Sequence, residues 1–528
     1  MDFIAENLYY LDLGDNHLTG KFPDWLAKMD LGHVLLSENN LTGSLPSRLF
    51  QSRSLSILAL SRNNFSGELP ENIGNAGAIM IFILSGNKFS EQIPKSIKNI
   101  YQLRLLDFSE NKFSGEVPDF GENPFLPYIR FSYNELSGKM PTTFSTVTQM
   151  IALGGNKFSG DLPRNLTNLV NLTHLDLHDN DIKGNFEDIL PLIPGGLQVL
   201  NLRNNFVEGF IPRTISNLTS LRILDLSANN LTGSISPEIG SLTRMIEIPD
   251  LASPHNISYL SIEYQALILN WKSSFQGIPS RNLDIYSFLD LSNNKIFGEI
   301  PASLGNLKGL KQLNLSHNKI SGVIPTSFDN MKSVESLDLS HNKILGLIPE
   351  SLTKLDELVI LDVSNNRLTS KIPVGGQMTT MNELNFYANN SGLCGMQIRI
   401  KCPEDISPSE QPRVMEDDND SWIPWEGTLI GFPIGFFLSI MIMAYSLNFL
   451  YIGQARNVTE LHLATFVPLF INLVPVINSD IPTPFFRIRS LKLLDISINF
   501  LQGGIPGEGF GNLTELIHLD LTNNNFNG

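Results

Sequence analysis

The chain has 528 residues, with 53 acidic and 37 basic side chains and a net charge of −16 near neutral pH. Phosphates would be repelled by this charge, which argues against nucleic acid as a partner. Two cysteines cannot build a disulfide scaffold, and no Cys/His spacing typical of a metal site occurs, so we expect neither metal nor cofactor.

The N-terminus reads MDFIAENLYY, without the basic start and apolar run of a secretion signal. A repeat begins at once, at Leu11. Because stacked coils need a polar cap at each end, we expect a chain truncated at its start, with the front cap missing.

The phrase L-x-L-x-x-N-x-L-x-G-x-I-P then returns about every 24 residues, for example at Asn205, Asn229, Asn318 and Asn342. A period this short predicts a stacked solenoid. Alternation in L-x-L buries two leucines of a short strand, each worth roughly 1.5–3 kcal/mol. We expect ten coils over residues 1–240 and four over residues 288–377.

The repeated asparagine has a structural task. Its amide offers both a donor and an acceptor to backbone groups that the turn would leave buried, and an unsatisfied group costs about 1–3 kcal/mol. We therefore expect these framework asparagines to hold the coils rather than a ligand.

The G-x-I-P element, as in Gly298-Glu299-Ile300-Pro301, resembles the plant-specific class of leucine-rich repeats. That resemblance implies an α/β solenoid, a twisted superhelix with a parallel sheet on its concave side. The outward strand positions are then candidate ligand contacts, although each can equally be solvated surface: Arg130, Tyr133, His174, Asp176, His178, Gln198, Asn201 and Arg203.

Residues 241–287 interrupt the period, and the segment from Tyr264 to Lys272 alternates like a strand. An island four repeats before the end of the array resembles plant receptor-like proteins, which lack a kinase domain. The resemblance implies that Tyr264, Trp271 and Lys272 belong to a ligand and co-receptor surface. The alternative is a passive disordered loop, which the aromatic residues disfavour.

Residues 378–403 resemble the C-terminal cap of this family, with the phrase Asn390-Ser391-Gly392-Leu393-Cys394-Gly395. Cys394 and Cys402 should pair in an oxidising compartment, two free thiols being the alternative.

An acidic stretch, 404–426, precedes a run without charge from Gly427 to Leu447. Twenty-one helical residues rise about 31 Å, enough to cross a bilayer, so we expect a single transmembrane helix within 427–452. A buried core helix is the alternative. Gly427, Gly431 and Gly435 share one helix face, and in the resembling family such glycines pair with an adaptor receptor kinase.

Ten N-x-S/T motifs before the uncharged run agree with repeats on the outside of the cell, although Asn-Leu-Thr phrases create some by chance. Two more, at Asn457 and Asn512, follow the run and could not be glycosylated if they lie in the cytoplasm. The candidate glycosylation sites are Asn40, Asn64, Asn165, Asn171, Asn217, Asn230, Asn256, Asn314, Asn389 and Asn419.

A receptor-like protein should end soon after its membrane helix, yet residues 453–528 follow and contain further repeat phrases near Leu494 and Leu519. A reading frame that joins two receptor genes is the simplest explanation, and a second membrane passage over 461–477 is an alternative. The glycine-rich segment 507–511 lacks the other kinase motifs, and we expect no enzyme.

Three functions fit this sequence. The first is a single-pass plasma-membrane receptor that binds an extracellular peptide, protein or glycan and signals through adaptor and co-receptor leucine-rich-repeat receptor kinases. Defence is commoner than development in the resembling family. The second is an adhesion or enzyme-inhibitor module, and the third is a nonfunctional truncated fusion.

Overall fold

The computed structural model describes residues 7–120, 123–248, 265–271, 274–279, 285–402, 459–462, 481, 483–505 and 507–527. It divides into two compact units, residues 1–103 with 408–528, and residues 104–407. Each unit is a stack of coils. The predicted transmembrane segment, Tyr264, Lys272, Asn256 and Asn419 lie outside the described residues.

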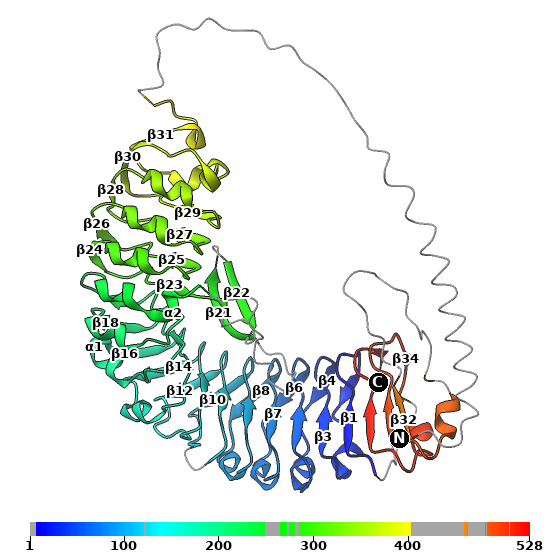
Figure 1. Cartoon of the computed structure of the whole chain (residues 1–528). Coiled ribbons are helices and arrows are strands. Elements are labelled where there is room, and N and C mark those ends of the chain that lie inside the picture. The colour runs from blue at the N-terminus through cyan, green and yellow to red at the C-terminus, as the bar shows by residue number, and fades with distance from the viewer. Residues whose placement is uncertain are drawn as a thin grey trace, which may run out of the picture. The chain divides into compact units, whose positions relative to one another are not determined.

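Each coil places a three-residue strand in a parallel concave sheet (Figure 1). In the second unit these strands are β9 (Leu105–Asp107), β11 (Tyr128–Arg130), β13 (Met150–Ala152), β15 (His174–Asp176), β17 (Val199–Asn201), β19 (Ile223–Asp225), β23 (Phe288–Asp290), β25 (Gln312–Asn314), β27 (Ser336–Asp338) and β29 (Ile360–Asp362). In the first unit they are β1 (Tyr10–Asp12), β3 (His33–Leu35), β5 (Ile57–Ala59), β7 (Ile81–Ile83), β32 (Glu460–His462), β33 (Leu493–Asp495) and β35 (His518–Asp520).

A second set of short parallel strands follows the framework asparagines on the flank of the coils. In the second unit it comprises β10 (Lys112–Gly115), β12 (Glu135–Gly138), β14 (Lys157–Gly160), β16 (Asp181–Asn185), β18 (Phe206–Gly209), β20 (Asn230–Leu231), β24 (Phe297–Glu299), β26 (Lys319–Ser321), β28 (Leu345–Gly346), β30 (Arg367–Lys371) and β31 (Gly392–Cys394). In the first unit it comprises β2 (Thr19–Lys21), β4 (Asn40–Gly43), β6 (Asn64–Gly67), β8 (Lys88–Gln92), β34 (Gln502–Gly503) and β36 (Asn525–Phe526).

The expected α/β character needs correction, because most helices are of the 3-10 type. They are η1 (Leu26–Lys28), η2 (Ser47–Gln51), η3 (Ile73–Asn75), η4 (Lys95–Asn99), η5 (Arg164–Asn168), η6 (Leu190–Leu192), η7 (Arg213–Asn217), η8 (Pro237–Ser241), η10 (Ala302–Asn306), η11 (Thr326–Asn330), η12 (Glu350–Lys354), η13 (Gly376–Thr379), η14 (Leu384–Tyr387), η15 (Met396–Ile398) and η17 (Thr483–Arg487). The α-helices among the described residues have four residues each: α1 (Phe186–Ile189), α2 (Thr243–Ile246) and α4 (Gly507–Phe510).

The proline of I-P explains the short helices. Pro301 precedes η10 as its N-cap residue in extended conformation, and the helix closes after one turn with Leu304 buried. Leu307 and Leu310 then return the chain to the next strand and are fully buried as well. A coil of this length has no room for a longer helix.

The framework asparagines bond backbone groups, as their chemistry predicts. The amide of Asn63 donates to the carbonyls of Leu36, Leu60 and Ser61 at 2.9–3.2 Å, and its oxygen accepts from the Leu41 amide at 3.0 Å. Each such side chain ties its own coil to the preceding one, and the repetition of this bond makes the stack continuous.

Phenylalanines fill the interior behind the asparagines. In the first unit the rings of Phe65 and Phe89 stack with centroids 6.1 Å apart, and in the second unit Phe108 and Phe131 lie 5.8 Å apart. All four are fully buried. The core is thus a column of rings and leucines that runs along each stack.

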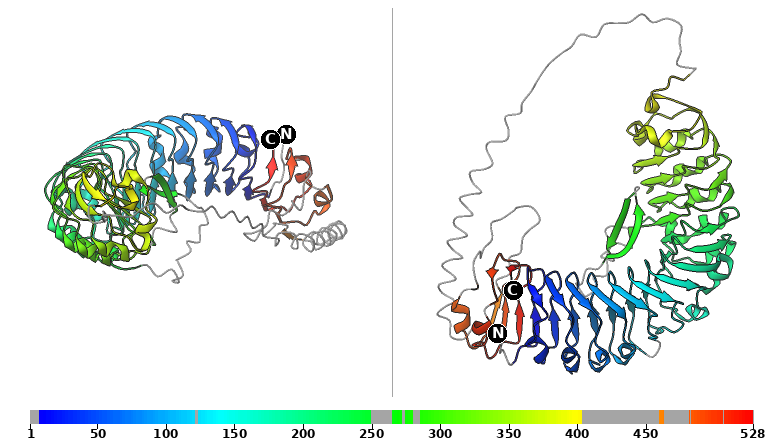
Figure 2. Two further views of the ribbon diagram at one scale, coloured as in Figure 1. Left: turned by 90° about the horizontal axis from the view of Figure 1, so that it is seen from above. Right: turned by 180° about the vertical axis from the view of Figure 1, so that it is seen from behind.

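The repeats near the C-terminus stack on the first coil of the chain (Figure 2, red against blue). Strand β35 pairs in parallel with β1, and the Tyr10 amide donates to the Ile517 carbonyl at 3.0 Å. The framework residue Asn16 donates to the Leu521 carbonyl at 3.1 Å, as it would to an ordinary preceding coil. The sequence predicts further repeats here, but not the edge on which they stack.

Two antiparallel strands lie in the interruption. They are β21 (Gln265–Trp271) and β22 (Ser274–Pro279), with Trp271 opposite Ser274. The concave sheet passes the interruption without a break, because β19 pairs directly with β23. The interruption is therefore an excursion from an intact stack.

Candidate functional site

Three consecutive coils of the concave sheet depart from the pattern of the others. Two residues after the end of the strand, most coils of the second unit carry serine: Ser109, Ser132, Ser227, Ser292, Ser316, Ser340 and Ser364. Gly154, His178 and Arg203 occupy this position in the three exceptions.

The usual serine closes a small local loop. In its own coil, Ser227 donates through its backbone amide and its hydroxyl to one carboxylate oxygen of Asp225, at 3.0 and 2.6 Å. His178 keeps this bond to its own strand, because its Nδ1 lies 2.7 Å from Oδ1 of Asp176. The imidazole, however, also reaches into neighbouring coils.

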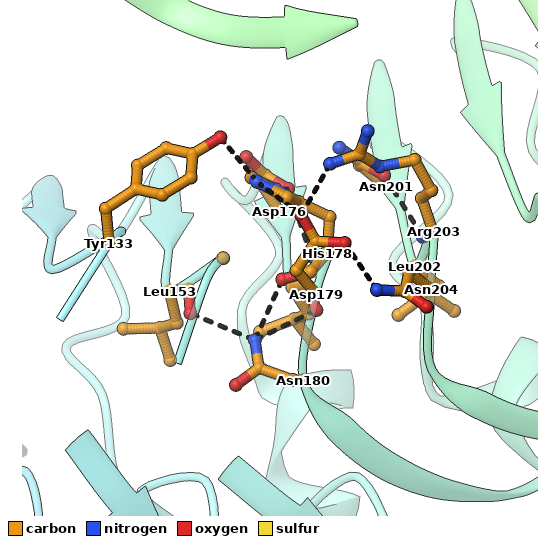
Figure 3. A network of polar contacts seen from close by, with 12 residues as sticks. Tyr133, Leu153, Asp176, His178, Asp179, Asn180, Asn201, Leu202, Arg203 and Asn204 are labelled. Carbon is orange, nitrogen blue, oxygen red and sulfur yellow. Dashed lines mark hydrogen bonds and ion pairs between the residues drawn. The ribbon is translucent and has the colours of Figure 1, made fainter. Parts of the chain in front are cut away.

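The other ring nitrogen of His178 lies 2.9 Å from the hydroxyl oxygen of Tyr133, two coils away (Figure 3). The coil between them carries Gly154 and Gly155. A Cβ at Gly154 would lie 2.2 Å from the imidazole, and one at Gly155 would lie 2.7 Å from the Tyr133 ring. Two glycines therefore make room for the contact.

Arg203 extends the cluster in the other direction. Its guanidinium bonds the Asp179 carboxylate at 2.7 Å, and Nε2 of His178 lies 3.8 Å from the same carboxylate (Figure 3). Asn204 donates to the second oxygen of Asp179 at 2.8 Å. We call Tyr133, Asp176, His178, Asp179 and Arg203 the His178 network.

Burial and charge act against each other at His178. The side chain is 1% exposed, and burial alone lowers its pKa. The negative charge of Asp176 and the hydrogen bond to it outweigh burial, so the pKa lies above its ordinary value. Burial, followed by the charge of Asp176, raises the pKa of Tyr133 to about 12, which keeps the phenol protonated.

Protonation of His178 reverses the direction of its bond to Tyr133. The neutral ring that donates from Nδ1 to Asp176 accepts at Nε2 from the phenol. The protonated ring donates from both nitrogens, so the phenol becomes an acceptor and its own proton is released for another partner. Tyr133 is half-buried on the concave surface, so a change in the protonation of His178 changes the hydrogen bonding of the Tyr133 hydroxyl there.

The structure places the candidate concave residues in two groups. Arg130, His174 and Gln198 are half-buried on the surface with Tyr133. We expected Asp176, His178, Asn201 and Arg203 to be open to a ligand as well. They are instead buried, at 5, 1, 0 and 8% exposure.

Arg130 and Asn201 lie beside the network. The Arg130 guanidinium bonds Asp107 at 2.5 Å on the adjacent strand, with both side chains nearly buried. Nδ2 of Asn201 is buried and has no hydrogen-bond partner among the described residues. Such a donor costs about 1–3 kcal/mol, a strain typical of functional positions.

A pair of carboxyl groups that the sequence analysis missed lies at the interruption. Asp225 and Asp290 are register partners on β19 and β23, both buried. Burial, and then the charge of Asp225, raises the pKa of Asp290 to about 8. Counting strands across the interruption would have placed the two side by side.

The structure also describes the predicted disulfide and one of the predicted glycosylation sites. Cys394 and Cys402 are bonded, with their Cα atoms 5.1 Å apart. Asn314 lies in concave strand β25 at 7% exposure and donates to Asp290 at 3.1 Å, so we no longer expect a glycan there.

No metal or membrane site is found in the described part of the chain. No three His, Cys, Asp or Glu side chains gather there as a metal site would require. Its helices are all too short or too polar to cross a bilayer, and the run from Gly427 to Leu447 is not part of it.

Comparison with known proteins supports the resemblance. The family described as leucine rich repeat matches residues 194–231, 287–344 and 320–368, and a second description of the repeat matches 7–29 and 54–76. Receptor-like protein 46 of Arabidopsis thaliana is 52% identical over 322 residues, which are 57% of this chain and 40% of the relative. These matches support a plant leucine-rich-repeat receptor-like protein.

The chain spans less than half the length of that relative. Among solved structures, the complex titled PEPR1-AtPEP1 is 24% identical, with a TM-score of 0.59 over 99% of this chain and 63% of the other. The Arabidopsis receptor kinase HAESA, solved with the peptide hormone IDA and the co-receptor SERK1, is 23% identical, with a TM-score of 0.55 over 99% and 71%. At these identities the likeness shows the fold alone.

Proposed function

We propose that this protein is a cell-surface receptor that binds an extracellular peptide, protein or glycan elicitor on its concave face. It signals through partner receptor kinases in plant defence. The observation that carries the proposal is the His178 network. Three adjacent coils there replace the usual serine by Gly154, His178 and Arg203, and the last two bond residues of other coils. The family resemblance supports the receptor class.

The network suits recognition better than stability. Its charges are partly buried, and ion pairs of this kind add little to folding compared with apolar packing. It instead fixes the position of Tyr133 and of the half-exposed Asp179 carboxylate. Preorganised polar groups with their geometry already fixed lose little entropy on binding, which favours a specific ligand.

Membrane attachment and kinase partners belong to this proposal as well. The uncharged run 427–447 would anchor the chain, and Gly427, Gly431 and Gly435 would face an adaptor kinase. A single passage places residues 453–528 across the bilayer from β1. The inserted chain therefore cannot keep the β1–β35 pairing.

The test is immunoprecipitation of the tagged full chain from plant cells, with and without a cell-wall extract. We expect receptor kinases with leucine-rich repeats to co-purify, and more of them with the extract. A matched variant, His178→Ser with Arg203→Ser, should lose the response to the extract and keep basal association. Recovery of no kinase under either condition would favour an adhesion or inhibitor module.

A further inference from the structure

The flank of the last four coils carries a row of basic residues. Lys295, Lys319, Lys343 and Arg367 each follow a framework asparagine, and all four are exposed. We call this row the basic column. It lies on the flank strands β24, β26, β28 and β30 or directly before them, away from the concave strands (Figure 1).

Backbone bonds place the four residues at the same point of successive coils. The Lys319 amide donates to the Ile296 carbonyl at 2.8 Å, Lys343 to Ile320 at 2.7 Å, and Arg367 to Ile344 at 2.8 Å. In the strand register Lys319 lies opposite Phe297 and Arg367 opposite Leu345, two residues beyond Lys295 and Lys343, so each member is offset along the strand from the one before it. The result is a row of positive charge that recurs once in each coil.

Earlier coils of the same unit fill this position differently. Lys112, Glu135, Lys157 and Asp181 alternate in sign, and Lys157 bonds Glu135 at 3.2 Å. Alternation is what a free surface favours, since like charges on neighbouring strands repel.

The basic column lacks this compensation. Lys319, Lys343 and Arg367 form no ion pair with any residue that the structure describes, while Lys295 bonds the neutral Asn230 side chain at 2.8 Å. Four adjacent cations thus persist in a protein whose net charge is −16. A bound anion would relieve their mutual repulsion further than solvent and salt do.

Apolar side chains lie beside the column. Phe297 is the strand partner of Lys319 and is 54% exposed, and Leu345 is the partner of Arg367 at 47%. Val323 and Leu347, each 54% exposed, come from the same coils. N-x-S/T motifs occupy the column position at Asn40, Asn64 and Asn230 but not in these four coils, so glycans leave the surface open.

We propose that the basic column and its apolar border bind a linear acidic polysaccharide, one carboxylate to each basic residue. A polyuronate carries one carboxylate on every ring of a stiff chain, so its charges form a line as regular as the column. The C–H faces of its rings suit contact with Phe297 and Leu345. This site is separate from the concave surface and does not depend on the His178 network.

The test measures binding of an oligogalacturonate of defined length to the purified full chain in detergent. Lys319→Gln with Lys343→Gln should weaken binding at least tenfold at low salt. The matched control, Lys308→Gln with Lys332→Gln, removes the same charge one coil apart elsewhere on the same coils and should change binding less than twofold. Equal loss in both variants would overturn the proposal.

Three further probes separate the polysaccharide from other anions. The methyl-esterified oligosaccharide, which keeps the rings and loses the charge, should not bind. Poly-L-glutamate and phosphatidylserine vesicles should bind more weakly than the oligogalacturonate. One of these two probes could bind the wild type more tightly than the oligogalacturonate does, and its binding could be the one that the Lys319/Lys343 variant weakens. In that case the site belongs to an acidic peptide or a lipid surface, and the proposal is wrong.

Discussion

The ring of Tyr10 lies parallel to the imidazole of His518, with centroids 3.9 Å apart. On the other side of Tyr10, the His33 ring meets it edge-on at 5.5 Å. Tyr10 therefore joins the first coil to a coil from the far end of the chain as closely as it joins its ordinary neighbour.

Insertion of residues 427–447 into a membrane predicts the loss of this contact. Because a single passage separates β1 from β35, Asn512 should stay without a glycan while Asn40 is glycosylated. Glycopeptide mass spectrometry of the plant-expressed chain checks this, with Asn40→Gln as the reference. A glycan on Asn512 would place β35 on the same side of the membrane as β1, which would exclude the single passage.

The Asp225–Asp290 pair predicts a loss of stability as pH rises. The pKa of Asp290 in the folded chain, about 8, lies above that of an exposed carboxyl group. Its contribution is therefore present at pH 4 and is lost as pH rises through 8, on the order of a few kcal/mol. Asp290→Asn should remove most of this dependence in thermal unfolding followed from pH 5 to 9.

Asparagine already occupies the equivalent strand position at Asn201 and Asn314, so the fold accepts this change. Asp362→Asn, at the same strand position in a later coil, serves as the control for the substitution itself. A pH profile equal in the wild type and Asp290→Asn would contradict the interpretation.

Adjacent asparagines offer a test of the framework. Asn39 is 5% exposed, donates to the Leu13 carbonyl at 2.9 Å and accepts from the Leu18 amide at 2.9 Å, while Asn40 is exposed. Asn39→Ala should lower the free energy of unfolding by about 2–4 kcal/mol, since it leaves buried backbone groups of the preceding coil without a partner. Asn40→Ala in unglycosylated protein should change it by less than about 0.5 kcal/mol. Equal effects in urea unfolding would argue against a structural role of Asn39.

The glycine coil predicts a specific clash. Gly154→Ala brings a Cβ to 2.2 Å from the His178 imidazole and should cost about 1–3 kcal/mol. His178→Ser restores the serine of the other coils and should relieve most of that cost in a double-mutant cycle. Gly195→Ala, whose nearest neighbour would lie 3.8 Å away, is the control. Additive effects of the two changes would show that Gly154 does not make room for His178.

The sequence allowed us to predict the parts of the fold that follow from the repeat phrase itself. Leucines at L-x-L and the amide of Asn63 follow from local burial and bonding, and both lie as predicted. The contact between Tyr133 and His178 was not predictable in this way, because it depends on two glycines in a third coil.

The stacking of β35 on β1 illustrates the second limit. A repeat phrase such as the one at Leu519 specifies a coil with two similar edges, and any matching edge satisfies its backbone. Which edge is used depends on the rest of the chain. The helical type was also missed, because the short turn after Pro301 depends on the room left by neighbouring coils.

Direct binding to the concave face is the most decisive measurement. Peptides selected from a random display library on the wild-type chain should bind His178→Ser/Arg203→Ser at least tenfold more weakly, by calorimetry. Their affinity should also change between pH 5 and 8, as the bond to Tyr133 reverses. Lys308→Gln/Lys332→Gln should bind them like the wild type. Selected peptides that bind the His178/Arg203 variant with unchanged affinity would contradict recognition through the His178 network.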